Sequence, residues 1–173
     1  MRRTEAIVAD IRQGYREGRK LLVLTERTDH LEVIENALHG TVGSLFVLHG
    51  RLSKPQRVKV IEELRALPPG KPRVLLATGR LIGEGFDHPP LDTLVLAMPI
   101  SWKGTLQQYA GRLHRTHVSK SDVRIYDYVD SGHPPLTRMW QKRHRGYRAM
   151  GYLIANTDAP VGAQEILERI PPR

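Results

Sequence analysis

The sequence predicts an α/β domain with a mostly parallel, open sheet and helices on both of its faces. Short continuous apolar runs, such as residues 21–24 and 45–48, are typical of strands that are buried on both sides of a sheet. Between these runs, apolar residues recur at helical spacing, so strands and helices alternate along the chain as they do in α/β folds. A chain of 173 residues is long enough for one such domain with a proper core.

The N-terminal part is predicted to contain two helices around the first strand. The first helix has an apolar face made of Ile7, Val8, Ile11 and Tyr15. Gly18 ends this helix, and the strand at 21–24 follows. Asp29 is the expected N-cap of the next helix, which Gly40 closes.

The strand at 45–48 opens a second strand–helix unit. Ser53 is the expected N-cap of its helix, with Pro55 in the first turn. Three apolar residues of this helix are expected to face inward: Val58, Ile61 and Leu64. Residues 68–72, Pro-Pro-Gly-Lys-Pro, then break the regular structure.

The second half of the chain is predicted to add further strands and helices. The strands are expected at 74–77, 94–97 and 123–129, and the helices at 105–115 and 134–155. We expect residues 1–160 to form the domain and residues 161–173 to be a tail or the start of a linker.

Charge and composition narrow the class of partner. The chain has 27 Lys and Arg against 18 Asp and Glu, a net charge of +9, which indicates a polyanion partner, nucleic acid before a membrane surface. Zero cysteines exclude disulfides and thiolate chemistry, and the histidines show no spacing typical of a metal site. The sequence has neither a long apolar stretch nor a signal-peptide core, so we expect a cytoplasmic protein without a membrane partner.

The predicted architecture also predicts where ligands bind. In open α/β sheets, ligands lie beyond the carboxyl ends of the strands. These ends are rich in Gly, Arg, Thr and acidic residues, at 25–28, 49–51, 78–87 and 99–104. We therefore expect the functional residues along that edge of the sheet.

The most informative stretch is QQYAGRLHR, residues 107–115. On a helix, Gln108, Arg112 and Arg115 lie on one stripe, and Gly111 keeps that stripe accessible. Two neighbouring guanidinium groups repel each other, and an anion such as a nucleotide polyphosphate makes their arrangement favourable. The alternative is a solvated basic face of a helix.

A second informative stretch is LLATGRLIGEGFDHP, residues 75–89. A buried strand leads into a loop with Gly79, Gly83 and Gly85, and Asp87 follows. Glycines allow a phosphate or a sugar to approach the backbone closely, and Asp87 can accept a hydrogen bond from a ribose hydroxyl. The alternative is a glycine-rich turn that is closed by a capping aspartate.

Together these stretches resemble the signature of superfamily 2 helicases. The first resembles motif VI, Q-x-x-G-R-x-x-R, at Gln108, Gly111, Arg112 and Arg115. ATGRLIGEGFD resembles motif V, which ends in G-x-D at Gly85 and Asp87, and its Glu-Gly-Phe-Asp form is similar to the restriction-enzyme and DNA-repair branch. LLVLTERTDHLEVIENAL resembles motif IV, and LHGRLSKPQR resembles the His-Gly segment that follows it. Over about residues 5–155, the order and spacing resemble the second RecA-like lobe of these enzymes, a three-layer fold of the P-loop NTPase type.

The resemblance implies roles for individual residues. In this family the motif VI arginines reach the γ-phosphate of ATP bound by the first lobe and act as arginine fingers, which implies that role for Arg112 and Arg115, with Gln108 near the nucleotide. It implies nucleotide contacts for Gly85, Asp87 and Gly111. It implies contacts with a nucleic-acid backbone, DNA in this branch, for Thr25, Arg27, Gly50 and Thr78.

The sequence lacks the parts that would hold ATP. It contains no G-x-x-x-x-G-K-[S/T] phosphate loop and no Asp-Glu pair after an apolar strand. The resemblance therefore implies an ATP-dependent helicase or translocase whose N-terminal RecA-like lobe, in the same parent chain, holds ATP and Mg²⁺. This chain alone is not expected to hydrolyse ATP. Two alternatives stay open: a non-catalytic nucleic-acid-binding α/β module, and a flavodoxin-like or nucleotide-sensing α/β domain.

The last predicted helix is crowded with basic residues: Arg138, Lys142, Arg143, Arg145 and Arg148. With Trp140 and Tyr147 among them, one interpretation is a helix that grips a phosphate backbone and stacks an aromatic ring on a base. The other is that the aromatic rings pack the helix on the sheet while its basic face stays in water.

Overall fold

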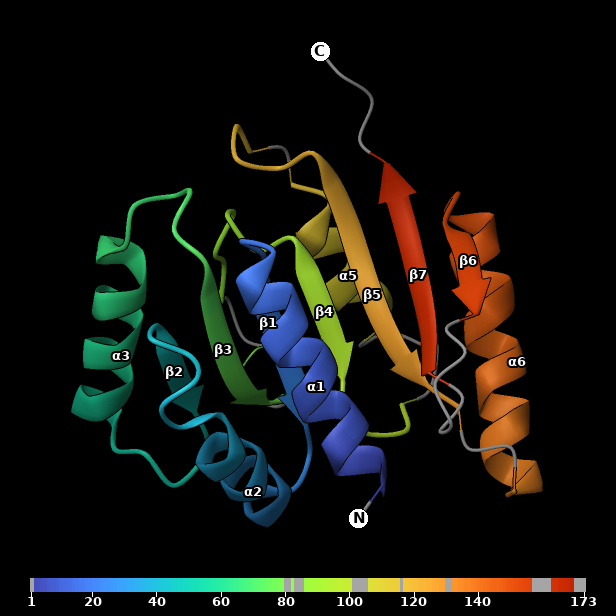
Figure 1. The fold of residues 1–173 in the computed structure, drawn as a ribbon, viewed down its shortest axis with the longest axis horizontal. Coiled ribbons are helices and arrows are strands. Elements are labelled where there is room, and N and C mark those ends of the chain that lie inside the picture. The colour runs from blue at the N-terminus through green and yellow to red at the C-terminus, as the bar shows by residue number, and fades with distance from the viewer. Residues whose placement is uncertain are drawn as a thin grey trace.

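The computed structural model describes residues 2–79, 82, 86–100, 106–115, 117–129, 132–156 and 163–169. A seven-stranded sheet lies between two layers of helices (Figure 1). The elements in chain order are α1 (Arg2–Arg16), β1 (Lys20–Thr25), α2 (Thr28–Leu38), β2 (Leu45–Leu48), α3 (Lys54–Ala66), β3 (Arg73–Thr78), β4 (Thr93–Leu96), α5 (Gln107–Leu113), β5 (Asp122–Tyr128), α6 (Pro134–Ala149), β6 (Leu153–Asn156) and β7 (Ala163–Arg169).

The sheet has the strand order β2-β3-β1-β4-β5-β7-β6. The strands from β2 to β5 in this order pair in parallel, with β1 between β3 and β4. β7 pairs antiparallel with β5, and β6 pairs antiparallel with β7. The predicted open, mostly parallel sheet is therefore confirmed, and each predicted strand is present.

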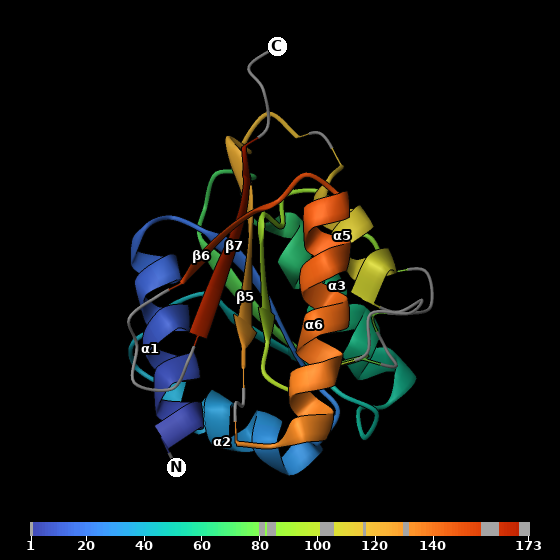
Figure 2. The same cartoon turned by 90° about the vertical axis from the view of Figure 1, so that its right-hand side faces the viewer.

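Helices cover both faces of the sheet, as predicted. α1 and α2 lie on one face, whereas α3, α5 and α6 lie on the other (Figure 2). Ile7, Ile11 and Ile34 belong to the core of the first face, and Leu64 and Tyr147 belong to the core of the second. Because both faces are covered, every residue of β1 is buried, which explains the continuous apolar run in its sequence.

The N-terminus of α3 is capped as the sequence predicts. The backbone N–H of Gln56 donates to the Ser53 hydroxyl at 3.4 Å, and the Ser53 N–H donates to the Gln56 side chain at 2.8 Å. This reciprocal capping box satisfies two N–H groups that the helix itself cannot pair. Its loss typically weakens a helix by about 1 kcal/mol.

Two details of the N-terminal half were predicted wrongly. Arg27, with extended backbone angles, is the N-cap of α2, and Asp29 lies in the first turn of that helix. Val58 was expected to face inward, but it is 47% exposed. α3 packs beside the edge strand β2 and is fully buried there only at Leu64, so Val58 stays outside the contact.

The C-terminal region also differs from the prediction. α6 ends at Ala149, short of the expected residue 155, because Gly151 adopts a positive φ of 90° that turns the chain out of the helix. β6 follows at once. Within the segment expected to be a tail or linker, Ala163–Arg169 forms β7, which covers the edge of β5. The domain boundary at residue 160 stays a prediction.

A buried ion pair anchors α6 to the sheet. The Arg143 guanidinium donates to both carboxylate oxygens of Asp127 on β5, at 2.7 and 2.9 Å, and to the carbonyl oxygen of Ile100 at 2.6 Å. The Tyr147 hydroxyl donates to the same carboxylate at 3.0 Å, and burial raises the pKa of that hydroxyl. Arg143 and Asp127 are both almost fully buried, so the position of α6 depends on a charge pair that water does not reach.

Candidate functional site

The segment after β3 returns across the face of the sheet that α5 covers. It leaves the carboxyl end of β3 at Thr78 and reaches the amino end of β4 at Thr93. Near its end, His88 Nε2 lies 3.0 Å from Nη1 of Arg73, the first residue of β3. Asp87 therefore lies toward the amino edge of the sheet, and the expectation that it lies beyond the carboxyl ends is wrong. The next parallel strand must start at the edge where β3 started, so the connection has to travel back.

Two side chains of α5 fasten this segment to the helix. The buried Tyr109 hydroxyl donates to the carbonyl oxygen of Gly79 at 2.5 Å, and Arg112 Nη1 donates to the carbonyl oxygen of Ile82. A Cβ on Gly79 would lie 3.3 Å from the Tyr109 hydroxyl oxygen, so glycine allows this close approach. Burial raises the pKa of the Tyr109 hydroxyl above its ordinary value.

Arg115, just beyond α5, contacts the end of the same segment. Its Nη1 lies 2.5 Å from Oδ2 of Asp87. The two side chains are 60% and 37% exposed, and an exposed ion pair of this kind contributes at most about 1 kcal/mol. Asp87 therefore holds the Arg115 guanidinium only weakly, and the guanidinium stays accessible from solvent.

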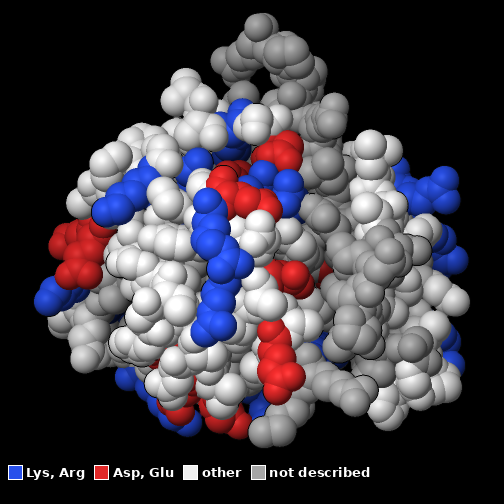
Figure 3. Space-filling view, in the orientation of Figure 1, with Lys and Arg blue, Asp and Glu red and all other residues white. Residues whose placement is uncertain are grey.

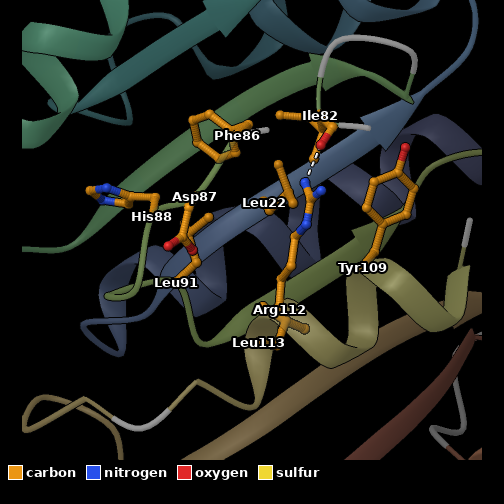
Figure 4. Close-up of a pocket in the computed structure, with 9 residues that line it drawn as sticks. All are labelled: Leu22, Ile82, Phe86, Asp87, His88, Leu91, Tyr109, Arg112 and Leu113. Atoms are coloured by element: carbon orange, nitrogen blue, oxygen red, sulfur yellow. Dashed lines mark hydrogen bonds between the residues drawn. The ribbon is translucent and has the colours of Figure 1, made fainter. Parts of the chain in front are cut away.

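A small pocket of about 300 Å³, counting its mouth, opens between α5 and this segment (Figure 4). Its lining residues are Leu22, Ile82, Phe86, Asp87, His88, Leu91, Tyr109, Arg112 and Leu113. In Figure 4 the Arg112 side chain extends from α5 toward Ile82, and Asp87 lies on the segment that faces the helix. The pocket is thus apolar in its depth, with a cation and a carboxylate on its walls.

The structure brings together three of the six residues that the motif V and motif VI resemblances single out. Asp87, Arg112 and Arg115 meet on the α5 face. Gln108 and Gly111 are exposed on α5, and a Cβ at Gly111 would meet no atom within 4 Å, so this side of the helix is open. The predicted site residue Gly85 lies outside the described residues.

A second group of predicted residues lies at the carboxyl edge. Thr25 and Thr78 are register partners at the ends of β1 and β3, and Gly50 is exposed just after β2. Arg27 is exposed, and its guanidinium pairs with Asp29 at 2.6 Å. The Thr25 side chain is only 2% exposed and its hydroxyl lies 3.3 Å from Nδ1 of His30, so it presents no hydroxyl at the surface.

These two groups lie at opposite ends of β3. Arg73 and Thr78 begin and end that strand, and five steps of about 3.3 Å make a separation of roughly 17 Å. Asp87 lies near the Arg73 end of β3, because the next residue, His88, contacts Arg73. The structure therefore separates Asp87 and Arg115 from Thr25 and Thr78, whereas Tyr109 near the start of α5 reaches Gly79 at the carboxyl end of β3.

His88 is held in its neutral form by its surroundings. It is buried, and burial together with the positive charge of Arg73 lowers the pKa of its imidazole to about 4. The fully buried Arg73 also donates to the carbonyl oxygens of Leu64 and Lys71, at 3.3 and 3.1 Å. A neutral imidazole can accept from Arg73, whereas a protonated one would face another cation.

Lowering the pH from about 6.5 to about 4 is expected to reduce the free energy of unfolding by about 3 kcal/mol through His88. In this window the unfolded chain protonates His88 and the folded chain does not, so stability falls as the pH falls. Urea unfolding of wild type and His88→Gln at several pH values measures the effect. The variant keeps an acceptor for Arg73 but cannot titrate, so its stability should depend less on pH; identical pH profiles would contradict the assignment.

Sequence reasoning missed Lys120. Its Nζ donates to the carbonyl oxygens of Leu113 and Arg115, at 2.9 and 2.8 Å, and so caps the C-terminus of α5. Burial lowers the pKa of this ammonium to about 8, against the attraction of the Asp92 and Asp87 carboxylates. No motif covers this lysine, because the turn after the helix, rather than helical spacing, brings it back to the end of α5.

Within the residues that the structure describes, no group of three or more His, Cys, Asp or Glu side chains could hold a metal ion. None of the described helices is both long and apolar enough to cross a membrane.

Known proteins are similar to this chain in sequence over part of its length. Residues 4–117 match the family described as Helicase conserved C-terminal domain. Uncharacterized protein 108L of Invertebrate iridescent virus 3 is 42% identical over 81 residues, which are 46% of this chain and 71% of that protein. A probable helicase of Escherichia phage T5 is 26% identical over 137 residues, which are 77% of this chain and 30% of that protein.

Two solved structures show the same fold. The C-terminal part of the Fun30 ATPase domain has a TM-score of 0.56 at 16% identity, over 67% of this chain and 37% of that one. T4 UvsW has a TM-score of 0.54 at 18% identity, over 67% of this chain and 23% of that one. The chain thus spans less than a third of the phage T5 relative and of T4 UvsW. The RecA-like fold is confirmed, and the chain belongs to the family of the helicase conserved C-terminal domain.

Proposed function

We propose that this chain is the C-terminal lobe of an ATP-dependent helicase or translocase and supplies arginine fingers to ATP held by an N-terminal lobe. The observation that carries the proposal is the position of Arg112 and Arg115. Both reach from α5 to the segment that ends at Asp87, on a face where Gln108 and Gly111 are open to a partner. The donor set is two guanidinium groups, which suits the oxygens of a polyphosphate.

In the proposed chemistry, the two arginines stabilise the negative charge on the γ-phosphate during ATP hydrolysis. When the lobes close, Arg115 exchanges the Asp87 carboxylate for the γ-phosphate, because a phosphate carries more charge and accepts two hydrogen bonds from one guanidinium. Arg112 adds a second cation while the bond to the γ-phosphate breaks. Asp87, once released, is free to accept from the ribose, with Gln108 and Gly111 beside the nucleotide. Mg²⁺ would neutralise the phosphates, held by the other lobe.

The proposed nucleic-acid contacts are at the carboxyl edge. The net charge of +9 favours a polyanion, with DNA as the first candidate. Arg27 and Gly50 are exposed there, and Thr78 is half-buried. At Gly50 a contact would come from the backbone N–H, whereas Thr25 is only 2% exposed, so neither its hydroxyl nor its backbone faces a ligand.

A second candidate is a non-catalytic nucleic-acid-binding module that kept the fold. This candidate is favoured by the net charge of +9 and by the lack of a phosphate-loop motif in the sequence. It differs from the first candidate in one respect: no ATP turnover would depend on Arg112 or Arg115.

ATP turnover of the intact protein that carries this lobe, with and without single-stranded DNA, separates the two. We expect DNA to stimulate turnover in wild type and Arg115→Ala to abolish it, whereas Arg16→Ala, which removes an exposed arginine of α1, should leave it unchanged. The isolated chain should not turn over ATP. Turnover that responds neither to DNA nor to Arg115→Ala would favour the binding module.

A further inference from the structure

The outer face of α6 carries a line of cations. Arg138, Lys142, Arg145 and Arg148, here called the α6 stripe, are all exposed. At 100° per residue they fall within about 120° of the helix circumference, and they extend over roughly 15 Å of its length. Figure 3 shows Lys and Arg atoms along the edge of the molecule where Figure 1 places α6. The four side chains therefore lie along one side of α6.

The charge of this stripe is not neutralised. α6 contains no Asp or Glu, and its remaining arginine, Arg143, points inward to Asp127. Among the residues that the structure describes, none makes an ion pair or a hydrogen bond with a side chain of the stripe. Four adjacent cations repel one another, so an anionic partner would stabilise this surface.

The aromatic residues of α6 do not belong to this surface. Tyr147 is fully buried, and Trp140 is half-buried with its ring centroid 5.5 Å from that of His144 and 6.4 Å from that of Tyr147. They pack α6 on the sheet, which agrees with the interpretation that the aromatic rings have a packing role and the basic face of the helix stays in water. The stripe is thus a basic surface on a helix that the buried Arg143 pair holds in place.

The stripe starts near the edge of the sheet that is proposed to contact nucleic acid. α6 follows β5, so its N-terminus lies at the carboxyl edge, the lower edge in Figure 1. Arg138 lies in the first turns of the helix, nearest the edge where Thr25 and Thr78 end their strands. A strand bound at that edge can continue along α6.

We propose that the α6 stripe binds the sugar-phosphate backbone of the nucleic acid, outside the contacts already proposed at the carboxyl edge. This inference rests on the proposed nucleic-acid partner. At 3.4 Å per nucleotide in a duplex strand, about 15 Å corresponds to four or five phosphates. The exposed positions between the cations are Gln141 and Ala149, so binding should be largely independent of sequence.

The same face argues against two other partners. A membrane-surface helix needs a large apolar side on its exposed face, and the exposed residues between the cations of the α6 stripe are Gln141 and the small Ala149. A stable protein interface needs an apolar centre, and the stripe has none. The phosphates of a nucleic acid, in contrast, can bind to a surface that offers only cations.

The test is binding of fluorescent single-stranded DNA of about 20 nucleotides to the chain, between about 50 and 200 mM KCl. The stripe variant replaces Arg138, Lys142, Arg145 and Arg148 by Gln. A control of equal charge replaces Arg16, Lys59, Arg65 and Lys71, which are exposed on α1, α3 and the turn after α3. If each stripe residue neutralises one phosphate, the slope of log affinity against log salt should fall by about 3, so that wild type loses about 50-fold more affinity than the variant across this range.

The control variant should keep most of the wild-type slope, and both variants should melt at the wild-type temperature. An unchanged slope in the stripe variant, or an equal fall in the control, would overturn the inference. Stripe-dependent binding of phosphatidylserine vesicles or poly-glutamate, with unchanged DNA binding, would assign the surface to a membrane or an acidic protein instead. Loss of turnover in Arg115→Ala tests the proposed function separately, because that residue is not on α6.

Discussion

Replacing Arg112 by alanine in the intact protein is expected to lower ATP turnover about 10³-fold or more, because an arginine finger contributes that much to phosphoryl transfer. Arg112 lies in the pocket on the α5 face, where its guanidinium donates to the carbonyl oxygen of Ile82. The substitution also removes this hydrogen bond, so we expect a modest loss of stability, about 1 kcal/mol. Turnover at saturating ATP and DNA measures the first effect, and urea unfolding measures the second.

Arg112→Lys is the matched control. It keeps the positive charge but loses the planar pair of donors, so a role that depends on bidentate contact with phosphate predicts a turnover nearly as low as that of Arg112→Ala. If lysine restored most of the turnover, Arg112 would act through charge alone. If both variants turned over ATP at the wild-type rate, Arg112 would be only a structural contact to Ile82.

Replacing Arg143 by methionine is expected to lower the free energy of unfolding by about 3–5 kcal/mol. The substitution leaves the buried Asp127 carboxylate without its cation and the carbonyl oxygen of Ile100 without its donor. Urea unfolding of the chain measures the loss. Lys142→Met, a neighbouring exposed position on the same helix, should change stability by no more than about 0.5 kcal/mol.

The double variant Arg143→Met with Asp127→Asn separates a broken charge pair from lost packing. Removing the stranded charge should recover part of the lost stability, because an unpaired buried carboxylate is the larger penalty. A double variant as unstable as the sum of the two single variants would show that the ion pair itself is not what anchors α6.

The parallel part of the fold could be predicted because its strands are buried on both faces. The runs at 21–24 and 74–77 are apolar at every position, and short runs of this kind are typical of strands covered on both faces. β6 and β7 escaped prediction for the opposite reason. Residues 163–169, AQEILER, form neither a continuous apolar run nor a strict alternation, and their pairing with β5 and β6 fixes them as a strand.

The candidate site also has a part that could be predicted from the sequence and a part that could not. The spacing of Arg112 and Arg115 was visible because both belong to one short helical motif. The contact of Arg115 with Asp87 joins residues 28 positions apart, and that of Arg73 with His88 depends on a loop crossing the sheet. Lys120 reaches α5 through a turn without any motif. Contacts set by the path of a loop carry no periodic signal in the sequence.

The path from Thr78 to Asp87 has a mechanical consequence. Two carbonyl groups of this segment, those of Gly79 and Ile82, accept hydrogen bonds from Tyr109 and Arg112 of α5. Because both donors belong to one helix, a displacement of α5 would be passed to the segment at two points. If Arg112 turned to a phosphate, as proposed above, the segment would lose the bond at Ile82 and keep the one at Gly79.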